Sequence, residues 1–570
     1  MSAAIEIPRT TERTRLDETI ARLREHAKAH AKLTVRERIT LARAMHAGFM
    51  RVAERSVIAA CRYKGIELGT PQEGEEWLAG PWATIRGLRL TIEALEAIEQ
   101  TGTTPCGRTG RTIDGRVKVD VYPASTMDKL LFPKVTAEVH FEAGATPEEL
   151  DASRARFYKQ PDHEGKVCLV LGAGNVNSIP PLDVISKMFN EGKVCLLKMN
   201  PVNGYVGPFI EEAFARAIEL GYLAVVHGGG EEGAYLCQHE GIDEIHITGS
   251  DKTHDMIVWG PPGPERAARM ARNEPLLKKE ISSELGNVSP VLVVPGPYDA
   301  KQLESQSENI GGAVTNNASF NCNAAKMLIT PKGWDKRDAL LDGIVKAFGH
   351  APARKAYYPG AAGRYQALTE GKTLRTVGGP AEGVLPWTLV PGLDAEDRTE
   401  KAFSTEPFCS IISETSVGGT DPVDYLEKAV AFANERLWGT LAATIVIHPT
   451  SLKDPKVAEA LEWAIVKLRY GAVGVNLWPA TIYGLGVTPW GAHPSSPLTD
   501  IQGGRGFVHN SAMYERIEKA VARGPLVPNP KLPWFPSHRT AHTLARRLTA
   551  IEGDLSWFKL PGIIAAALGS

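Results

Sequence analysis

Two residues of this 570-residue chain are of types that can carry chemistry, a cysteine that could act as a nucleophile and a glutamate. Cys322 lies in the segment NNASFNCNAAK, among small and amide side chains, and Glu284 lies 38 positions earlier in KKEISSELGNVSPV. A cysteine thiolate is a strong nucleophile, and a carboxylate can serve as the general base of the same reaction. Neither residue is diagnostic alone, because most cysteines are small buried hydrophobic residues and most glutamates are solvated at the surface.

Three turns that contain glycine could approach a phosphate-bearing cofactor. LGAGNVNSIPPLD begins like the G-x-G-x-x-G fingerprint, but Asn177 stands where the third glycine belongs. The other two turns, HGGGEEG and ITGS, contain Gly229, Gly230, Thr248, Gly249 and Ser250. Backbone N–H groups at such turns can bind an anion. The alternatives are purely structural turns and, for Ser250, a helix N-cap.

The elements that must position these residues follow the pattern of a parallel α/β protein. From residue 166, apolar strand-like runs alternate with amphipathic helical stretches as far as DEIHIT at 243–248. A second such region runs from SPVLVVP through helical stretches near 301–326 and 336–348 to LAATIVI, and ends near 479. This alternation predicts parallel βαβ units. We expect the Cys322 segment to lead into a helix.

The two ends of the chain have different patterns. Helical periodicity in 15–60 and 75–99 predicts a helical lead-in, and alternating residues in 117–122 and 137–141 predict strands of a hairpin or edge ribbon. The ribbon either makes subunit contacts or is a simple surface hairpin. The tail beyond 510, with its basic segment HRTAHTLARRL, is expected to dock on protein, such as a sister subunit, with a membrane surface as the alternative.

Composition excludes several classes of function. A formal net charge of -2 provides no field to attract nucleic acid or anionic lipid. Seven cysteines without a C-x-x-C pair argue against a disulfide framework and a structural zinc site, so no metal is expected. The start, MSAAIEIPRTTERTR, lacks the apolar core of a signal peptide, and no apolar run is long enough for a transmembrane segment. We expect a cytoplasmic, multidomain globular protein.

Taken in order, the motifs resemble those of the aldehyde dehydrogenase superfamily. ITGS, ELGNVSPV and NNASFNC occur in the family's order and nearly its spacing, the distance from Glu284 to Cys322 being slightly wider than usual. STEPF at 404–408 resembles the family's Glu-x-Phe element, and YGAVGVNLWPA followed by TPWGAHP resembles its closing segments. The resemblance covers roughly residues 15–510.

The resemblance implies an aldehyde dehydrogenase-like α/β fold, with two doubly wound parallel-sheet domains for cofactor binding and catalysis and a small oligomerisation ribbon. The expected parts are a helical lead-in of the cofactor domain at 1–115, an oligomerisation ribbon at 116–160, an NAD(P)-binding domain at 161–284, a catalytic domain at 285–479, and a return segment with an oligomerisation strand and tail at 480–570. A homodimer or homotetramer is expected on the same basis.

Catalytic roles carry over to matching positions. Cys322 would attack the aldehyde carbon, and Glu284 would activate the water that hydrolyses the resulting thioester. The Cys322 backbone N–H and a side-chain amide would hold the oxyanion. Counting back from Lys198 without a gap gives Asn175 as that amide, and Asn177 is the alternative.

The resemblance also implies NAD or NADP as the cofactor. Lys198 matches the lysine that contacts the adenosine ribose, unless it is a solvated lysine at a strand end. Glu406 matches the ligand of the nicotinamide ribose, with Phe408 packed beside it. The glycine-containing turns would supply Gly229, Gly230, Thr248, Gly249 and Ser250 along the pyrophosphate. Pro201 replaces the acidic residue often found three positions after the lysine, which leaves NADP open.

Two departures from the family's motifs concern the acyl pocket. Asn287 replaces the second glycine of Glu-Leu-Gly-Gly, and Ser319-Phe320 replace the usual Gly-Gln. The leading hypothesis is oxidation of a small-molecule aldehyde to a carboxylic acid. The alternatives are a coenzyme-A-acylating aldehyde dehydrogenase or acyl reductase, and an inactive nucleotide-binding scaffold; retention of Glu284 argues against both.

Overall fold

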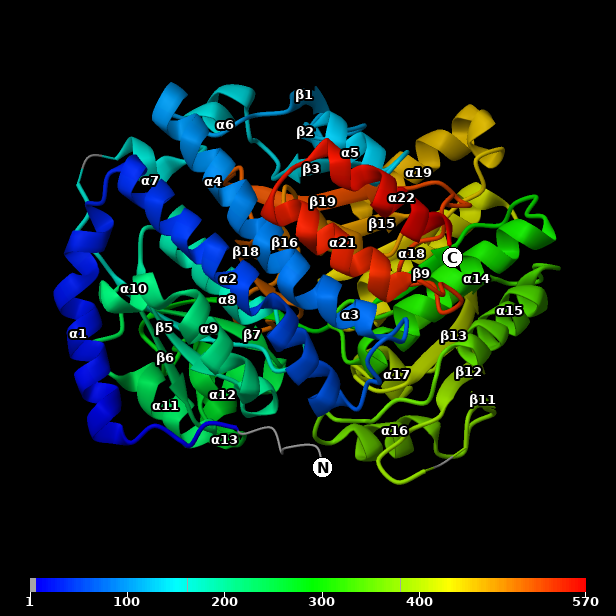
Figure 1. Cartoon of the computed structure of the whole chain (residues 1–570). Helices are drawn as coiled ribbons and strands as arrows, with labels where there is room; N and C mark the ends of the chain where they lie inside the picture. The colour runs from blue at the N-terminus through cyan, green and yellow to red at the C-terminus, as the bar shows by residue number, and fades with distance from the viewer. Residues whose placement is uncertain (1–6, 161, 380, 570) are drawn as a thin grey trace.

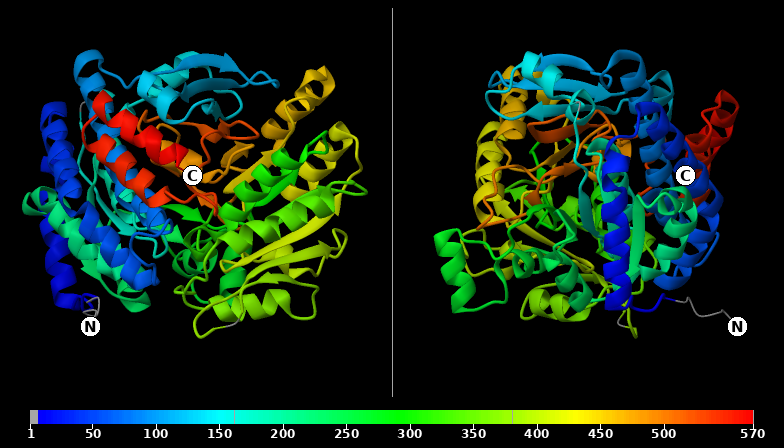
Figure 2. Two further views of the ribbon diagram at one scale, coloured as in Figure 1. Left: turned by 45° about the vertical axis from the view of Figure 1, so that its right-hand side comes forward. Right: turned by 90° about the vertical axis from the view of Figure 1, so that its left-hand side faces the viewer.

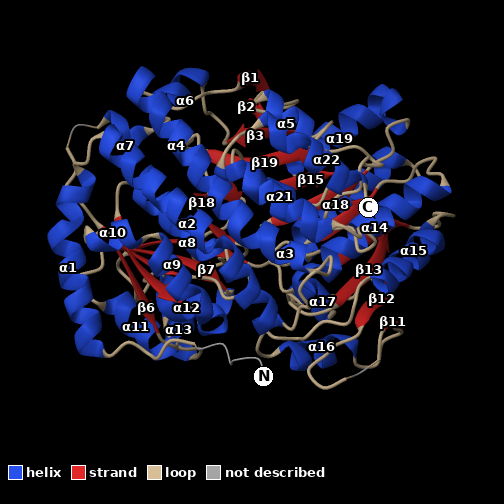
Figure 3. Ribbon diagram, viewed as in Figure 1, coloured by secondary structure: helices blue, strands red, loops and turns tan. Residues whose placement is uncertain are grey.

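The computed structural model describes residues 7–160, 162–379 and 381–569 and builds them around two large sheets (Figures 1 and 3). The prediction that the start of the chain lacks a signal peptide falls in part on residues 1–6, which lie outside the described ranges. The first sheet has the strand order β17 (Gly504–Arg505), β8 (Glu280–Leu285), β7 (Glu244–Gly249), β4 (Val167–Leu171), β5 (Val194–Met199) and β6 (Leu223–His227). Only the short β17 runs antiparallel to its neighbour in this sheet as described. The parallel βαβ prediction from residue 166 is confirmed.

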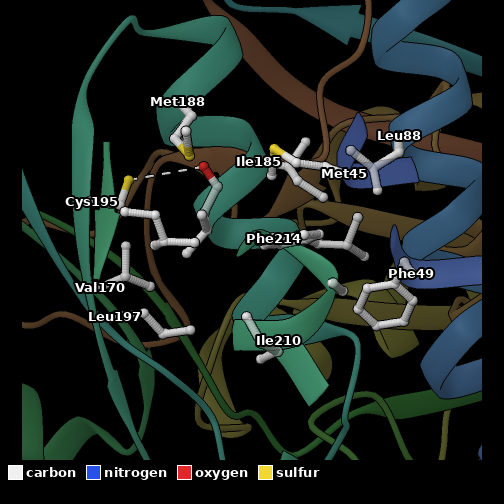
Figure 4. Close-up of a cluster of buried hydrophobic side chains, with 14 of the residues drawn as sticks. Met45, Phe49, Leu88, Val170, Ile185, Met188, Cys195, Leu197, Ile210 and Phe214 are labelled. Atoms are coloured by element: carbon white, nitrogen blue, oxygen red, sulfur yellow. Dashed lines mark hydrogen bonds between the residues drawn. The ribbon is translucent and has the colours of Figure 1, made fainter. Parts of the chain in front are cut away.

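The core of this half consists of strands, inner helices and outer helices. β4 and β5 are buried along their whole length, as parallel strands covered on both faces should be. Val170 on β4 faces Ile185 of α8 (Ile179–Ile185) and Phe214, which follows α9 (Gly207–Ala213), and these pack in turn against Met45 and Leu88 of the outer helices (Figure 4). The N-terminal helices therefore complete the core of the first sheet.

The helical lead-in is confirmed, and it is divided into several helices. They are α1 (Arg13–Ala31), α2 (Val35–Lys64), α3 (Glu73–Trp77) with the π-helical turn η1 (Leu78–Trp82), and α4 (Ala83–Thr101). The break between α1 and α2 occurs at Thr34, whose side chain accepts a hydrogen bond from the Glu37 backbone N–H while Glu37 bonds back to Thr34. This capping box starts a new helix inside a continuous helical pattern.

The remaining helices of this half connect its strands or follow them. They are η2 (Ser186–Asn190), the 3-10 turn η3 (Pro201–Val206), α10 (Ala215–Glu219), α11 (Gly230–Gln238), α12 (Asp251–Trp259) and α13 (Pro264–Arg272). β4 and β7 are adjacent in the sheet although they are not consecutive in the chain. Such a switch of strand order opens a crevice at the carboxyl ends of the strands, where open α/β sheets bind ligands.

The second sheet carries Cys322 and continues into the ribbon. Its order is β1 (Arg108–Arg111), β2 (Val117–Tyr122), β3 (Thr136–Phe141), β19 (Ile517–Arg523), β15 (Ala472–Val475), β14 (Ala442–Val446), β9 (Pro290–Val293), β10 (Met327–Pro331), β13 (Ile411–Val417), β12 (Trp387–Leu393) and β11 (Arg375–Val377). Neighbours from β19 to β12 are parallel. The helices of this half are α14 (Ala300–Thr315), α15 (Arg337–His350), α16 (Ala361–Thr369), α17 (Lys401–Ser404), α18 (Pro422–Arg436), α19 (Pro455–Lys467) and α20 (Ala480–Leu485). The second predicted α/β region is confirmed.

The prediction of a helix over 301–326 is wrong beyond Thr315. After α14 comes a 3-10 turn, η4 (Asn316–Ser319), in which residues 317–319 have positive φ, and Cys322 then leads into strand β10 and not into a helix. Asparagine and small residues enter the left-handed region more readily than bulky or β-branched ones. The run of amide and small residues thus ends the helix before the cysteine.

The predicted ribbon is present, and its edge pairs within the same chain. β2 and β3 are antiparallel, with α5 (Thr126–Leu131) between them, and β3 pairs with β19, which itself pairs with β15. Figure 2 shows the ribbon in blue and cyan at the top, beside orange β19. The small helices α6 (Pro147–Ser153) and α7 (Arg156–Lys159) follow it. The ribbon therefore extends the chain's own second sheet, and the homo-oligomer remains a prediction.

The C-terminal tail docks on its own chain. α21 (Ala541–Gly553) packs against α3 and α4, and α22 (Leu560–Leu568) packs against α21. The buried Arg86 guanidinium of α4 donates hydrogen bonds to Glu552 at 2.7 Å and to Asp128 at 3.2 Å, and Glu552 also pairs with Arg89. Within the described ranges, no helix combines the length and apolarity needed to cross a bilayer.

We predict that Glu552→Gln lowers the free energy of unfolding by about 3 kcal/mol, because it leaves the buried Arg86 without its main counter-charge. Urea denaturation followed by tryptophan fluorescence measures this effect. The control is Glu93→Gln, which removes a more exposed partner of Arg89 and should change stability by less than about 1 kcal/mol. Equal stability of both variants and the wild type would contradict a clamping role.

Candidate active site

Cys322 lies in the loop that joins α14 to β10. Its side chain packs against the apolar cluster that contains Leu477 and Trp490. Its backbone N–H donates no hydrogen bond to the described part of the chain, so it is free to bind an oxyanion. Burial raises the pKa of the thiol well above its ordinary value, and the neighbouring Glu284 carboxylate raises it further. The resting nucleophile is therefore a thiol that needs a base.

Glu284 has the properties of that base. It lies near the end of β8 and is buried, and neither of its carboxylate oxygens has a hydrogen-bond partner in the described structure. Burial raises its pKa from 4.5 to about 7, and the charge of Asp183 acts in the same direction. A carboxylate with a pKa near neutral can take a proton from a thiol or a water at physiological pH. Glu284 is therefore not the solvated surface residue that a lone glutamate in this position would usually be.

The Lys326 ammonium joins three parts of the site that are distant in the sequence. Its Nζ donates to the Cys322 carbonyl at 2.9 Å and to the Asn287 carbonyl at 3.0 Å, and it forms an ion pair with Glu406. The side chain is almost fully buried. Lys326 thus fixes the Cys322 loop to the turn after Glu284. It is not among the residues predicted from the sequence, where the only signal is a lysine directly before a strand-like apolar run.

The turn Gly286–Asn287 explains one departure from the family's motif. A Cβ atom on Gly286 would lie 1.9 Å from a carboxylate oxygen of Glu406, so only glycine leaves room for that side chain. The Asn287 side chain donates to the Ala442 carbonyl at 2.9 Å and accepts from Ser289 at 2.7 Å. Asn287 therefore ties the turn to β14 of the second sheet.

Asn175 is the amide that lies against the nucleophile loop. Its Nδ2 donates to the Phe320 carbonyl at 2.9 Å, two residues before Cys322. Asn177 points elsewhere, since it donates to Glu76 at 3.4 Å and accepts from Tyr205 at 3.2 Å. The geometry favours Asn175 over Asn177 as the side-chain donor of an oxyanion site.

A buried ion pair from the N-terminal helices holds Asn175 and the loop before Cys322. Lys64 Nζ donates to Glu76 at 2.8 Å, to the Asn175 carbonyl at 3.2 Å and to Asn317 Oδ1 at 3.0 Å. Tyr357 donates to the same carbonyl and the same amide oxygen, at 3.1 and 2.8 Å. This network was not anticipated, because Lys64 and Glu76 belong to helices whose pattern shows only periodicity.

On the cofactor side, Lys198 lies at the end of β5 with little exposure, so the interpretation as a solvated lysine is wrong. Burial lowers its pKa, while the carboxylate of Glu232 opposes this. The side chain is largely buried, but its ammonium is not among the fully buried atoms that lack a hydrogen-bond partner in the described structure. A lysine held in this way, with its charge still accessible, fits a ligand rich in hydroxyl or phosphate oxygens.

The glycine-containing turns lie at the starts of two helices. Gly229 caps α11, and the space in front of Gly230 is open. Ser250 caps α12, because its side chain accepts a hydrogen bond from the Thr253 N–H at 3.2 Å. This is the helix N-cap role that was the alternative to cofactor binding. Gly249, directly before it, is exposed. Thr248 differs: its hydroxyl donates to buried Asp183 at 3.0 Å.

The aromatic residue of the Glu-x-Phe element lies over the nucleophile loop. Phe408 packs against Phe320 and Tyr358, at centroid distances of 5.6 and 4.9 Å. Phe320, one of the residues that replace Gly-Gln, thus forms an aromatic wall with Phe408 and Tyr358.

No family model matches the chain. Two curated relatives are named N-succinylglutamate 5-semialdehyde dehydrogenase. The protein of Novosphingobium aromaticivorans is 26% identical over 258 residues, which cover 44% of this chain and 50% of that protein. The protein of Caulobacter vibrioides is 25% identical over 298 residues, which cover 51% and 56%. The matches thus span about half the length of these relatives.

Solved structures match over most of the chain. The NADP-dependent glyceraldehyde-3-phosphate dehydrogenase of Bacillus halodurans C-125 has a TM-score of 0.58 at 17% identity, covering 90% of this chain and 91% of its own. The NAD-dependent aldehyde dehydrogenase of Sinorhizobium meliloti has a TM-score of 0.58 at 18% identity, covering 90% and 87%. These likenesses establish the fold.

The chain has the fold of the aldehyde dehydrogenases, and about half of it is similar in sequence to curated aldehyde dehydrogenases. Within this fold, the structure brings Cys322, Glu284 and Asn175 to one place, with Glu406 tied to them through Lys326. Lys198 and the starts of α11 and α12 lie at the carboxyl edge of the first sheet.

We predict that the double variant Lys64→Met/Glu76→Gln lowers kcat for aldehyde oxidation about 10- to 100-fold, because small misplacement of a catalytic group has effects of this size. Removal of both charges at once avoids an unpaired buried ion, so the melting temperature should stay close to that of the wild type. Lys355→Met, in which an exposed lysine is lost, is the control. A kcat equal to the control's would show that the pair has only a structural role.

Proposed function

We propose that the chain oxidises an aldehyde to a carboxylic acid with NAD+ or NADP+, through a thioester on Cys322. The observation that carries the proposal is the position of Glu284, a buried carboxylate whose pKa is raised by burial to about 7, beside the half-buried Cys322, whose thiol interacts with it. A carboxylate kept in this costly state is suited to moving protons.

In the first half of the reaction, Glu284 takes the thiol proton as Cys322 Sγ attacks the aldehyde carbon. The carbonyl oxygen gains negative charge, and the Cys322 backbone N–H and the Asn175 amide stabilise it as a thiohemiacetal oxyanion. NAD(P)+, when bound, accepts the hydride. The thioester on Cys322 remains.

Before the second half, Glu284 releases the thiol proton to solvent; it then takes a proton from water, and the hydroxyl oxygen attacks the thioester carbon. The C–S bond breaks, the carboxylic acid leaves, and the Cys322 sulfur regains a proton from Glu284. Aldehyde, water and NAD(P)+ thus give carboxylate, NAD(P)H and two protons. Lys326 keeps Cys322 in register with Glu284 through both steps.

The residues present fit a dinucleotide. Lys198 provides an accessible ammonium on a largely buried side chain for the adenosine ribose, and the helix starts at Gly230 and Ser250 face the expected pyrophosphate path. Glu232 accepts from the Gly229 N–H at 2.6 Å and acts electrostatically on Lys198. Its carboxylate would repel a 2′-phosphate, which favours NAD+ over NADP+ although Pro201 leaves both open.

We predict that Glu284→Gln slows the initial formation of NAD(P)H and also lowers the steady-state rate by about 100-fold or more. The first phase loses the base for the Cys322 thiol, and the second loses the base for the water that hydrolyses the thioester. Stopped-flow absorbance of reduced nicotinamide measures both phases. Glu280→Gln, on the same strand with an exposed side chain, is the control, and Cys322→Ala should show neither phase.

The wild-type steady-state rate should fall as the pH drops through about 7, because Glu284 is then protonated and cannot accept a proton. Glu284→Gln should lose this dependence. Turnover that requires coenzyme A would support the acylating alternative, and no turnover with any aldehyde would support a scaffold.

A further inference from the structure

A second group of buried polar side chains lies beside the Cys322–Glu284 pair and takes no part in the chemistry above. Asp183 of α8 is fully buried; its Oδ2 accepts from Thr248, while its Oδ1 has no partner in the described structure. His509 follows β18 (Phe507–Val508), which pairs with β16 (Trp490–Gly491). The His509 ring is also buried, and neither of its nitrogens has a partner there.

These two side chains face each other across a gap. His509 Nε2 lies 3.8 Å from Asp183 Oδ1, which is too far for a hydrogen bond. Burial lowers the pKa of His509 to about 4, so the ring is neutral at pH 7 and supplies no counter-charge. His246 faces the other oxygen of the same carboxylate: its Nε2 lies 3.5 Å from Asp183 Oδ2, while its Nδ1 bonds with Ser282 at 2.8 Å. Asp183 Oδ1 and the unprotonated ring nitrogen of His509 are therefore two hydrogen-bond acceptors without a donor.

A small cavity adjoins His509, and Asp183 lies across the gap from the imidazole, outside the residues that line the cavity. It has a volume of about 30 Å³ and is lined in part by Gly87, Leu182, Ser186, Tyr483 and His509. A volume of this size holds a small polar group or one or two waters.

Tyr483 connects this cavity to the nucleophile. Its ring lies 4.6 Å from that of His509 and 5.7 Å from that of Trp490, between centroids, and Cys322 packs against the cluster that contains Trp490. The Tyr483 hydroxyl is engaged with Ser178 at 2.7 Å, which leaves Asp183 and His509 as the free acceptors. The same wall therefore borders both the cavity and the reacting thiol.

We propose that Asp183 and His509 form a substrate subsite for a hydrogen-bond donor, a hydroxyl or ammonium group, carried by the aldehyde whose carbonyl lies at Cys322. The proposal rests on the function proposed above and specifies its substrate class. The donor would bridge Asp183 Oδ1 and the unprotonated nitrogen of His509. An aldehyde with a terminal carboxylate would meet the negative charges of Asp183 and Glu284 and would be disfavoured.

The test compares substrates within one enzyme. Aldehydes of three to six carbons with a terminal hydroxyl or ammonium are assayed beside alkanals and carboxy-aldehydes of matched length, with the wild type, Asp183→Leu and Asp335→Leu. Asp335 has a largely exposed side chain and provides the control. The ratio of kcat/KM between donor-bearing aldehyde and alkanal cancels any effect of Asp183 on Glu284.

The wild type should prefer a donor-bearing aldehyde at least about tenfold, since a site built to bond a donor rejects analogues that lack it. Asp183→Leu should abolish this preference, so that the ratio of kcat/KM between donor-bearing aldehyde and alkanal falls to about one whatever the variant's absolute rate. The leucine variant should also fold, because it removes an unsatisfied buried charge. Equal preference in wild type and Asp183→Leu would overturn the subsite.

A second measurement separates the subsite from the proposed function. Unreactive amides with a terminal hydroxyl or ammonium should slow alkylation of Cys322 by iodoacetamide in the wild type and not in Asp183→Leu, while alkyl amides should protect both equally. If such protection is seen without turnover of any aldehyde, the subsite stands and the proposed oxidation fails. If no amide distinguishes the two proteins, the subsite is refuted even where aldehydes are oxidised.

Discussion

The site depends on one buried ammonium group, that of Lys326. It lies where the chain passes from the first sheet to the second, and it bonds to the loop of the nucleophile, the turn after the general base and the carboxylate of Glu406. Each of these partners belongs to a different segment, so their relative positions would otherwise rest on loop packing alone. A lysine removed from water needs several acceptors to offset the loss of hydration, and the three partners supply them. The same requirement that stabilises Lys326 also sets the geometry of the reacting groups.

The buried charged groups of this molecule are of two kinds. Those that join helices to the rest of the structure form ion pairs, as Lys64–Glu76 and Arg86–Glu552 do. Two buried carboxylates lack such a counter-charge: burial raises the pKa of Glu284, and Asp183 Oδ1 has no hydrogen-bond partner among the described residues. Unsatisfied buried groups cost stability and persist where the surrounding structure holds them in place. The paired charges around the site hold the unpaired ones in position.

The departures from the family's motifs have identifiable structural consequences. Asn287 replaces a glycine and bonds to β14, and Phe320 replaces a glutamine and packs into an aromatic wall with Phe408. The C-terminal tail, which lies beyond the segment that resembles the family, forms helices that pack on α3 and α4, and the Arg86–Glu552 ion pair joins them. The ribbon extends the chain's own second sheet, because β3 pairs with β19. These features distinguish the chain within an otherwise shared fold.

The sequence by itself determined the kinds of elements and the candidates for chemistry. Apolar runs such as VCLVL predicted buried parallel strands because the pattern is local, and the ordered motifs pointed to Cys322, Glu284 and Asn175. Only the tertiary structure decided that the helix before Cys322 stops at Thr315, that Asn175 rather than Asn177 faces the nucleophile loop, and that Lys64 and Lys326 hold the site. The physical reason is that a pKa, a hydrogen-bond partner and a buried ion pair depend on burial and on neighbours distant in the chain, whereas strand and helix periodicity depends on residues a few positions apart.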